Sequence, residues 1–192
     1  MIRGLVLCGG ESKRMGRDKG MLVTGGATWA EHAVTKLREL DIPVVISVNE
    51  KQLASYRCIF DQGLLVLDQV DAKGPLSGLL SVHLQYPMDD LLVLACDMPE
   101  MDVHTLRVLK DDATTFPEFD TYCYVNKGII EPLCALYTST FLKYVYSTMK
   151  KGILPGFSLQ RIIKQGRHKE IPVVDHVVFN NHNSPLNILF QQ

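Results

Sequence analysis

The first half of this 192-residue chain repeats one pattern, in which a short continuous apolar run is followed by a break and an amphipathic stretch. The apolar runs cover residues 4–8, 44–48, 64–67 and 91–95. Because each run is continuous rather than alternating, it is typical of a strand that is covered on both faces. Strands that alternate with helical stretches pair in parallel through crossover helices. We therefore expect an α/β protein with three layers, α/β/α, and a mostly parallel central sheet.

Helical periodicity fills the breaks between these runs. Apolar residues recur at helical spacing across 29–40, and Thr28 with Glu31 three positions later predicts a capping box. After about residue 112 the alternation of apolar runs with helical stretches becomes less regular, although short apolar runs and helical stripes continue. Further helices are expected at 52–60, 75–85, 102–110, 141–149, 158–165 and 185–190, and further strands at 121–125, 132–137, 171–174 and 177–179.

Length and composition exclude several classes of protein. At about 150 residues per domain, this length predicts a single domain over residues 1–192. Hydrophobic residues make up 46% and charged residues 21% of the chain, as in globular proteins. The formal net charge of −1 supplies no global field that would draw the chain onto nucleic acid or anionic lipid. No apolar run approaches the roughly 18 residues that a membrane span requires.

The cysteines point to the compartment. They number five and form no C-x-x-C pair, which argues against a disulfide framework and a structural zinc site. Too few apolar residues precede Cys8 for an export signal. We therefore expect a cytoplasmic protein.

The segment 7–19 follows the first strand directly and therefore emerges at the carboxyl edge of the sheet, where open α/β folds bind ligands. Gly9 and Gly10 lack Cβ atoms, so main-chain N–H groups can approach a base or a phosphate closely. Arg14 and Lys19 add cations to the same segment. The spacing is neither that of a P-loop nor G-x-G-x-x-G. A ligand-binding loop is favoured over a glycine-rich turn with solvated charges.

Acidic residues follow two of the other strands. Asp97 ends a wholly apolar strand and is a candidate Mg²⁺ ligand, because Asp102 is better placed to cap the following helix. Asp68 also follows a strand, and an Asx turn is its alternative role. Gly74 and Pro75 begin a helix whose free N–H groups can receive a base oxygen or a phosphate, although an ordinary helix start explains them nearly as well.

These motifs resemble those of a known family. A Gly-Gly-x-Ser-x-Arg-Met-Gly loop over residues 9–16 is followed by Gly-Pro-Leu-Ser-Gly at 74–78, Ala-Cys-Asp-Met-Pro at 95–99 and Asn-His-Asn-Ser-Pro at 181–185. The set is similar to the signature of the molybdenum cofactor guanylyltransferases, within the wider nucleotidyltransferases, and it spans nearly the whole chain. The resemblance implies a Rossmann-like nucleotidyltransferase fold.

The resemblance also implies an activity, which is transfer of GMP from GTP to molybdenum-bearing molybdopterin with release of pyrophosphate and a requirement for Mg²⁺. Arg14, Lys19 and Asp97 are then the catalytic residues, and Asp97 binds the metal. No general base is needed, because the attacking phosphate is already anionic. The acceptor is assigned to Asn181 and Asn183, and transient contacts with proteins that deliver or accept the cofactor are expected. The nucleotide is assigned to Leu7, Cys8, Gly9, Gly10, Lys19, Asp68, Gly74, Pro75 and Asp97.

The resemblance is weaker in the second half. Residues 1–112 are expected to bind the nucleotide and residues 113–192 the acceptor. Glu131 stands near a position where family members commonly have His, residues 152–155 lack an Arg that often follows the Gly, and Cys8 replaces a more usual Ala. Two alternatives therefore stay open: a related transferase that uses CTP or another phosphorylated acceptor, and a catalytically silent nucleotide- or cofactor-binding module.

Overall fold

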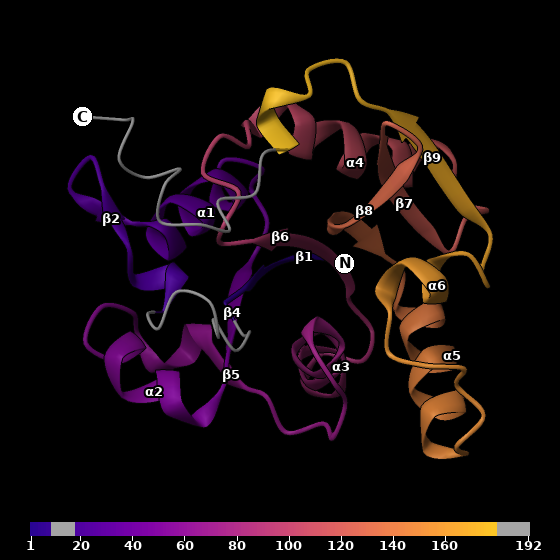
Figure 1. Cartoon of the computed structure of the whole chain (residues 1–192), viewed down its shortest axis with the longest axis horizontal. Coiled ribbons are helices and arrows are strands. Elements are labelled where there is room, and N and C mark those ends of the chain that lie inside the picture. The colour runs from indigo at the N-terminus through magenta and orange to yellow at the C-terminus, as the bar shows by residue number, and fades with distance from the viewer. Residues whose placement is uncertain (9–17, 180–192) are drawn as a thin grey trace.

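The computed structural model describes residues 1–8 and 18–179. A seven-stranded sheet with the order β5-β4-β1-β6-β8-β7-β9 runs through the protein (Figure 1). Four of its neighbouring pairs are parallel and two are antiparallel, so the sheet is mostly parallel as predicted. Its strands are β1 (Ile2–Leu7), β4 (Val44–Val48), β5 (Leu65–Leu67), β6 (Asp90–Ala95), β7 (Thr121–Asn126), β8 (Ile129–Tyr137) and β9 (His168–Pro172).

Helices cover both faces of this sheet and confirm the three-layer prediction. The helices α1, α2 and α4 contribute to one core cluster, and α3, α5 and α6 contribute to the other. Figure 1 shows α3, α5 and α6 together on one side of the sheet, with α4 and α1 on the other. The helices are α1 (Trp29–Arg38), α2 (Glu50–Tyr56), α3 (Pro75–Gln85), α4 (Val103–Thr115), α5 (Ser139–Lys150) and α6 (Leu159–Ile163), with short 3-10 turns η1 (Lys19–Met21), η2 (Gln62–Leu64) and η3 (Val177–Phe179).

The strand order places a topological switch point in the middle of the sheet. From β1 the chain moves to β4 and then to β5, and α3 returns it across the sheet to β6 on the other side of β1. These four strands are parallel, so their carboxyl ends share one edge. Open α/β sheets bind ligands where the direction of winding reverses. A ligand is therefore expected to bind at the ends of β1 and β6.

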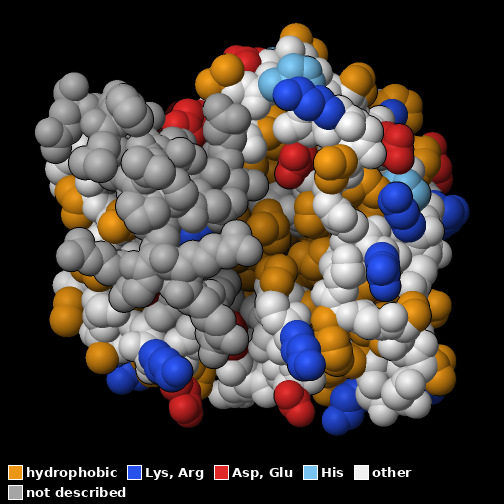
Figure 2. Space-filling view, in the orientation of Figure 1, with side chains coloured by type: hydrophobic (Ala, Val, Ile, Leu, Met, Phe, Trp, Pro, Cys, Tyr) orange, Lys and Arg blue, Asp and Glu red, His pale blue; other side chains and the backbone are white. Residues whose placement is uncertain are grey.

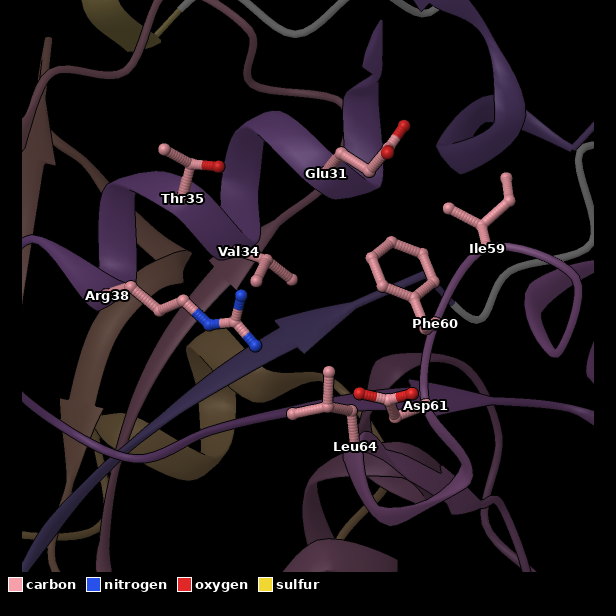
Figure 3. Close-up of a pocket in the computed structure, with 8 residues that line it drawn as sticks. All are labelled: Glu31, Val34, Thr35, Arg38, Ile59, Phe60, Asp61 and Leu64. Carbon is pink, nitrogen blue, oxygen red and sulfur yellow. The ribbon is translucent and has the colours of Figure 1, made fainter.

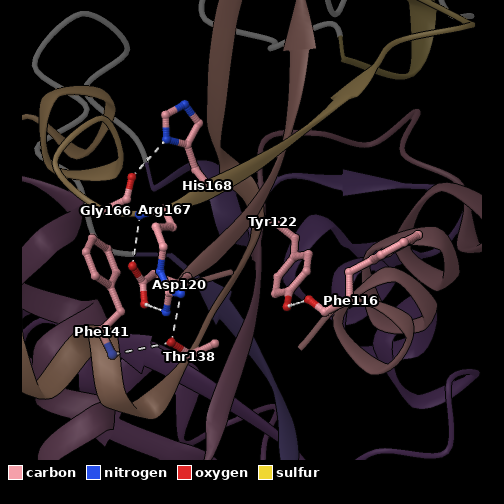
Figure 4. A network of polar contacts seen from close by, with 8 residues as sticks. All are labelled: Phe116, Asp120, Tyr122, Thr138, Phe141, Gly166, Arg167 and His168. Atoms are coloured by element: carbon pink, nitrogen blue, oxygen red, sulfur yellow. Dashed lines mark hydrogen bonds and ion pairs between the residues drawn. The ribbon is translucent and has the colours of Figure 1, made fainter. Parts of the chain in front are cut away.

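The second half extends the same sheet without a break. The strand β8 pairs antiparallel to β6, with Leu94 opposite Cys134, and β7 and β9 follow. Asp120 joins three segments here (Figure 4): its carboxylate Oδ2 accepts from the Arg167 N–H at 2.8 Å, and its carbonyl accepts from Thr138 Oγ1 at 3.0 Å. Beside it, Tyr122 donates its hydroxyl to the Phe116 carbonyl. These bonds tie the start of β7 to the end of β8, the start of β9 and the end of α4.

Local signals explain most element boundaries. The predicted capping box of α1 is present, since Glu31 N–H donates to Thr28 Oγ1 at 3.2 Å and Thr28 N–H donates to Glu31 Oε2 at 2.7 Å. Asp102 caps α4 by accepting from Thr105 N–H at 2.6 Å. The capping residues therefore predicted the starts of α1 and α4 correctly.

Two predicted strands near the end of the described chain are corrected. Residues 177–179 form the turn η3 rather than a strand, because the Asp175 side chain accepts from Val177 N–H at 2.9 Å and starts a helical turn. The strand expected at 171–174 is β9, which spans His168–Pro172 instead. As an edge strand it is half-exposed and polar, so it lacks an apolar pattern. The helix expected at 185–190 lies outside the described residues.

A small hairpin was not predicted. Val23–Thr24 (β2) and Ala27–Thr28 (β3) pair antiparallel around Gly25 and Gly26, whose φ angles are 60° and 85°. Two consecutive residues with positive φ define the tight turn that a Gly-Gly pair favours. The Gly-Gly pair was the available signal, but strands of two residues are too short to show periodicity.

The described surface carries charges of both signs. In the view of Figure 2, Lys and Arg side chains are interspersed with Asp and Glu, without a broad cationic area on the part of this face that is described. Of the helices in the described ranges, none has both the length and the apolar character that crossing a membrane requires.

Candidate functional site

Lys19 and Asp97 meet at the switch point between β1 and β6. The Lys19 Nζ atom lies 2.7 Å from Asp97 Oδ2, although 78 positions separate the two residues in sequence. Lys19 begins η1 and Asp97 follows β6, so each comes from a connection at the carboxyl edge. Their side chains are only 17% and 18% exposed, which limits screening of the pair by water. The structure thus joins the two residues on which the predicted site depends.

Asp18 fixes the position of the neighbouring Lys19. Its Oδ1 atom accepts from Gly20 N–H at 3.0 Å and from the Tyr56 hydroxyl at 3.2 Å. Its Oδ2 atom accepts from the Gln52 amide at 2.9 Å, and the same amide donates to the Cys8 carbonyl at 2.8 Å. One buried Gln52 side chain therefore holds both residues that flank segment 9–17. No sequence pattern predicted a role for Gln52, Tyr56 or Asp18.

The Tyr56 contact is sterically specific. Burial, as the largest cause, raises the pKa of Tyr56 far above its ordinary value, so its hydroxyl stays protonated and donates to Asp18. A Cβ atom on Gly20 would lie 2.0 Å from that hydroxyl oxygen. Glycine at position 20 is therefore required for Asp18 and Lys19 to sit against α2.

Cys8 and Cys96 directly follow β1 and β6, at the same edge of the sheet. Leu7 is opposite Ala95 in the β1–β6 ladder, and the Cys96 N–H donates to the Leu7 carbonyl at 3.2 Å. Leu7 itself is buried in the core, so only its main chain faces the edge. A hydrogen bond with the Cys8 thiol, followed by burial, raises the pKa of Cys96 well above its ordinary value. Cys8 and Cys96 thus follow paired positions on neighbouring strands.

Asp68 lies in the same edge but apart from Asp97. It follows β5, which is three strands from β6, so at about 4.8 Å per strand the two strand ends are separated by on the order of 14 Å. Asp68 Oδ1 accepts from Ser47 Oγ at 2.5 Å. A Cβ atom on Gly78 of α3 would lie 3.1 Å from Asp68 Oδ1, so α3 packs closely against the carboxylate. Asp68 is therefore too distant to share a metal ion with Asp97.

Asp68 predicts a pH-dependent stability. Burial raises its pKa above the ordinary value of 3.8, against a smaller opposing effect of the Ser47 hydrogen bond. As pH rises, this carboxyl ionises in the unfolded chain before it ionises in the folded protein, so the free energy of unfolding falls between the two pKa values. We expect Asp68→Asn to be more stable than the parent at neutral pH and equally stable in acid below the ordinary pKa. Urea unfolding in both buffers measures the difference.

The exposed Asp71 provides the matched control, because Asp71→Asn should shift stability little at either pH. A less stable Asp68→Asn protein at neutral pH would show instead that the Ser47 hydrogen bond outweighs the effect of burial.

The N-terminus of α3 has no side-chain cap, and a hydrogen-bonded serine holds the loop that precedes it. Gly74 is the N-cap, with φ 67° and no side-chain cap, and Pro75 is the first helical residue. The preceding loop is held by Ser81 Oγ, which accepts from the N–H groups of Gln69 and Val70 at 2.8 and 3.0 Å. The N–H groups of the first turn of α3 are thus held in place, at the same edge of the sheet as the end of β5.

The remaining predicted residues divide into two groups. Gly9, Gly10, Arg14, Asn181 and Asn183 lie outside the described residues. Of those described, Cys8, Lys19 and Asp97 gather at the switch point, and Asp68 and Gly74 stand further along the edge toward β5.

A cavity of about 260 Å³ between α1 and the segment after α2 is separate from this group (Figure 3). Its walls combine apolar and charged side chains, and the close-up shows Val34, Arg38 and Leu64 turned toward a common space. The lining residues are Glu31, Val34, Thr35, Arg38, Ile59, Phe60, Asp61 and Leu64. None of them is a predicted site residue.

The described residues contain no group of three or more His, Cys, Asp or Glu side chains that could cage a metal ion. Mg²⁺ does not require such a cage, because it usually keeps several waters and binds one or two carboxylates together with substrate phosphates. Asp97, partly exposed at the carboxyl edge, suits that mode of binding.

Known proteins are similar to this chain in sequence. The molybdenum cofactor guanylyltransferase of Pseudomonas syringae pv. syringae is 36% identical over 115 residues, 59% of this chain and 56% of that relative. The chain thus matches little more than half of that relative's length. The probable molybdenum cofactor guanylyltransferase of Opitutus terrae is 33% identical over 173 residues, 84% of this chain and 77% of the relative.

Solved structures share the fold. Molybdopterin-guanine dinucleotide biosynthesis protein A from Archaeoglobus fulgidus superposes with a TM-score of 0.79 at 19% identity, over 98% of this chain and 95% of that chain. A Mycobacterium tuberculosis protein that was solved in complex with manganese has a TM-score of 0.57 at 16% identity, over 90% and 87% of the two chains. Finally, the family model described as MobA-like NTP transferase domain matches residues 4–169, and the chain belongs to this family.

Proposed function

We propose that this protein transfers GMP from GTP to the phosphate of molybdenum-bearing molybdopterin and releases pyrophosphate, with Mg²⁺ as cofactor. The observation that carries the proposal is the 2.7 Å pair of Lys19 and Asp97 at the switch point of the sheet. The names of the Pseudomonas and Opitutus relatives support the choice of donor and acceptor.

The roles of the residues follow from their charge and position. Asp97 would hold Mg²⁺, which when bound supplies positive charge beside the triphosphate. Lys19, held in place through Asp18, exchanges its carboxylate partner for phosphate oxygens when the nucleotide binds. Arg14 is proposed as a second clamp on the same phosphates. Together they favour the charge that develops on the leaving pyrophosphate.

The acceptor needs no activation by a protein base. Its phosphate is already anionic at neutral pH and attacks the α-phosphorus directly. The main task of the protein is therefore to hold two anionic substrates in line and to neutralise their repulsion. We propose that residues 1–112 bind the nucleotide and residues 113–192 the acceptor, with Asn181 and Asn183 among its contacts, and that delivery of the acceptor involves transient protein contacts in the cytoplasm.

A nucleotide screen tests the identity of the donor. We expect Mg²⁺ with GTP to raise the thermal stability of the protein more than CTP, ATP or UTP, since a ligand at 100 times its dissociation constant adds about 2.7 kcal/mol. Pyrophosphate release upon addition of molybdopterin then measures the reaction. Chelation of Mg²⁺ should reduce both signals. A larger shift with CTP would reassign the donor, and tight GTP binding without pyrophosphate release would indicate a silent binding module.

A further inference from the structure

Cys8 and Cys96 occupy paired positions at the ends of two neighbouring parallel strands. Each follows directly after the last residue pair of the β1–β6 ladder, Leu7 opposite Ala95. The bond from Cys96 N–H to the Leu7 carbonyl, 3.2 Å, continues the ladder to this level. Neighbouring strands lie about 4.8 Å apart, which falls within the Cα separation of roughly 4.4–6.8 Å found in disulfides.

The side chains of this pair also point to the same side of the sheet. Cys8 and Cys96 belong to one core cluster, which covers the face that α1 and α4 pack against. A hydrogen bond with the Cys8 thiol is also the largest cause that raises the pKa of Cys96. The separation and the orientation that a disulfide requires are therefore both present.

No other pair among the five cysteines meets these conditions. Cys123 and Cys134 are on adjacent strands, but their side chains belong to opposite core clusters. Cys134 pairs with Leu94, two positions from Cys96, and such diagonal neighbours are about 7–8 Å apart. Cys58 is exposed on the surface after α2. Oxidation of this chain within one molecule is thus directed to a single pair.

We propose that Cys8 and Cys96 are a modification site, at which a small peroxide forms a reversible disulfide that disables the triphosphate site. In the first step the Cys8 sulfur attacks hydrogen peroxide, the O–O bond breaks, and a sulfenic acid and one water result. In the second step the Cys96 sulfur attacks the Cys8 sulfur, the S–O bond breaks, and a second water leaves. The two thiols lose two electrons and two protons, and the peroxide is reduced to two waters.

The consequence for the site follows from the neighbours of the pair, and it rests on the proposed function. Cys8 immediately precedes segment 9–17, and its carbonyl is held by the Gln52 amide that also binds Asp18. Cys96 immediately precedes Asp97. Bonded sulfurs lie about 2.05 Å apart, far closer than sulfurs in van der Waals contact. Formation of the disulfide therefore displaces the backbone at both residues. Because a displacement of about 1 Å in a catalytic group can cost about 100-fold in rate, we expect at least a 10-fold loss of turnover.

The test oxidises the full chain with hydrogen peroxide after complete reduction. Peptide mapping without reductant should find the Cys8–Cys96 link, and pyrophosphate release should fall at least 10-fold and return when dithiothreitol is added. Cys96→Ser should keep the reduced-state activity and lose the sensitivity to peroxide, and Cys96→Ala replaces it if the serine variant does not fold. Cys58→Ser is the matched control and should remain as sensitive as the parent.

Two results would overturn the proposal: a peptide map without the Cys8–Cys96 link after oxidation, or a linked protein that turns over at the rate of the reduced one. Because the map needs no nucleotide, it separates this proposal from the proposed function. A linked protein whose reduced form binds no GTP would support the modification site and contradict the guanylyltransferase assignment, along with the predicted loss of turnover.

Discussion

Asp97→Asn is expected to lower the turnover of GMP transfer at least about 100-fold, which is the scale of one preorganised transition-state contact. The substitution keeps the shape of the side chain and one oxygen, but it removes the charge that would hold Mg²⁺ beside the triphosphate. The partly buried position makes the loss larger than it would be on an open surface, because water screens the site less. Pyrophosphate release from saturating GTP and acceptor measures the effect.

A matched control separates this loss from a general effect of removing a carboxylate. Asp61 is exposed and forms no side-chain capping bond at the start of η2, so Asp61→Asn should turn over as the parent does. Circular dichroism should show both variants folded at the assay temperature. Near-normal transfer by folded Asp97→Asn would remove Asp97 from the catalytic residues.

Apart from the β2–β3 hairpin, the strands and helices of the first half could be predicted because their signals are local. The boundaries of β4 and α3 agree with the predicted ranges 44–48 and 75–85. A continuous apolar run identifies a strand that is covered on both faces, wherever it lies in the sheet. The edge strand β9, with His168, Lys169 and Glu170, has no apolar pattern to find.

The site was predictable only in part. That Lys19 and Asp97 lie at one edge follows from parallel pairing, since residues after parallel strands emerge together. The distance between each acidic residue and a metal held by Asp97 depends on the strand order, which no local pattern reveals. Asp68 and Asp97 both follow strands, yet β4 and β1 stand between those strands.

The support beneath the site was not predictable from one sequence. Gln52 reads as an ordinary polar residue near the start of a helix, and nothing local shows that its amide reaches Cys8 and Asp18. The pairing of Cys8 with Cys96 likewise depends on β1 and β6 being neighbours, which follows from the crossover through α3. Contacts of this kind are set by the fold rather than by local sequence.

Lys19→Ala should also lower turnover at least about 100-fold, because it removes a fixed cation from the leaving pyrophosphate. The ammonium lies 2.7 Å from Asp97 in the free protein, and Asp18 and Gln52 hold the backbone that carries it. A loose surface lysine would have to be ordered in each turnover, whereas Lys19 is already in place. Initial rates of pyrophosphate release at saturating GTP test the loss in turnover, and rates at low GTP test the loss in binding.

Two comparisons show whether Lys19 and Asp97 act as one unit. Lys51 is exposed on α2, so Lys51→Ala changes the net charge equally and should leave the rate unchanged. If both site residues act on the same triphosphate, the double variant Lys19→Ala/Asp97→Asn should lose much less than the product of the two single losses, since groups that work together are not additive. Independent, multiplicative losses would place the two residues on different steps of the reaction, and an unchanged rate for Lys19→Ala would leave their 2.7 Å contact as a structural ion pair alone.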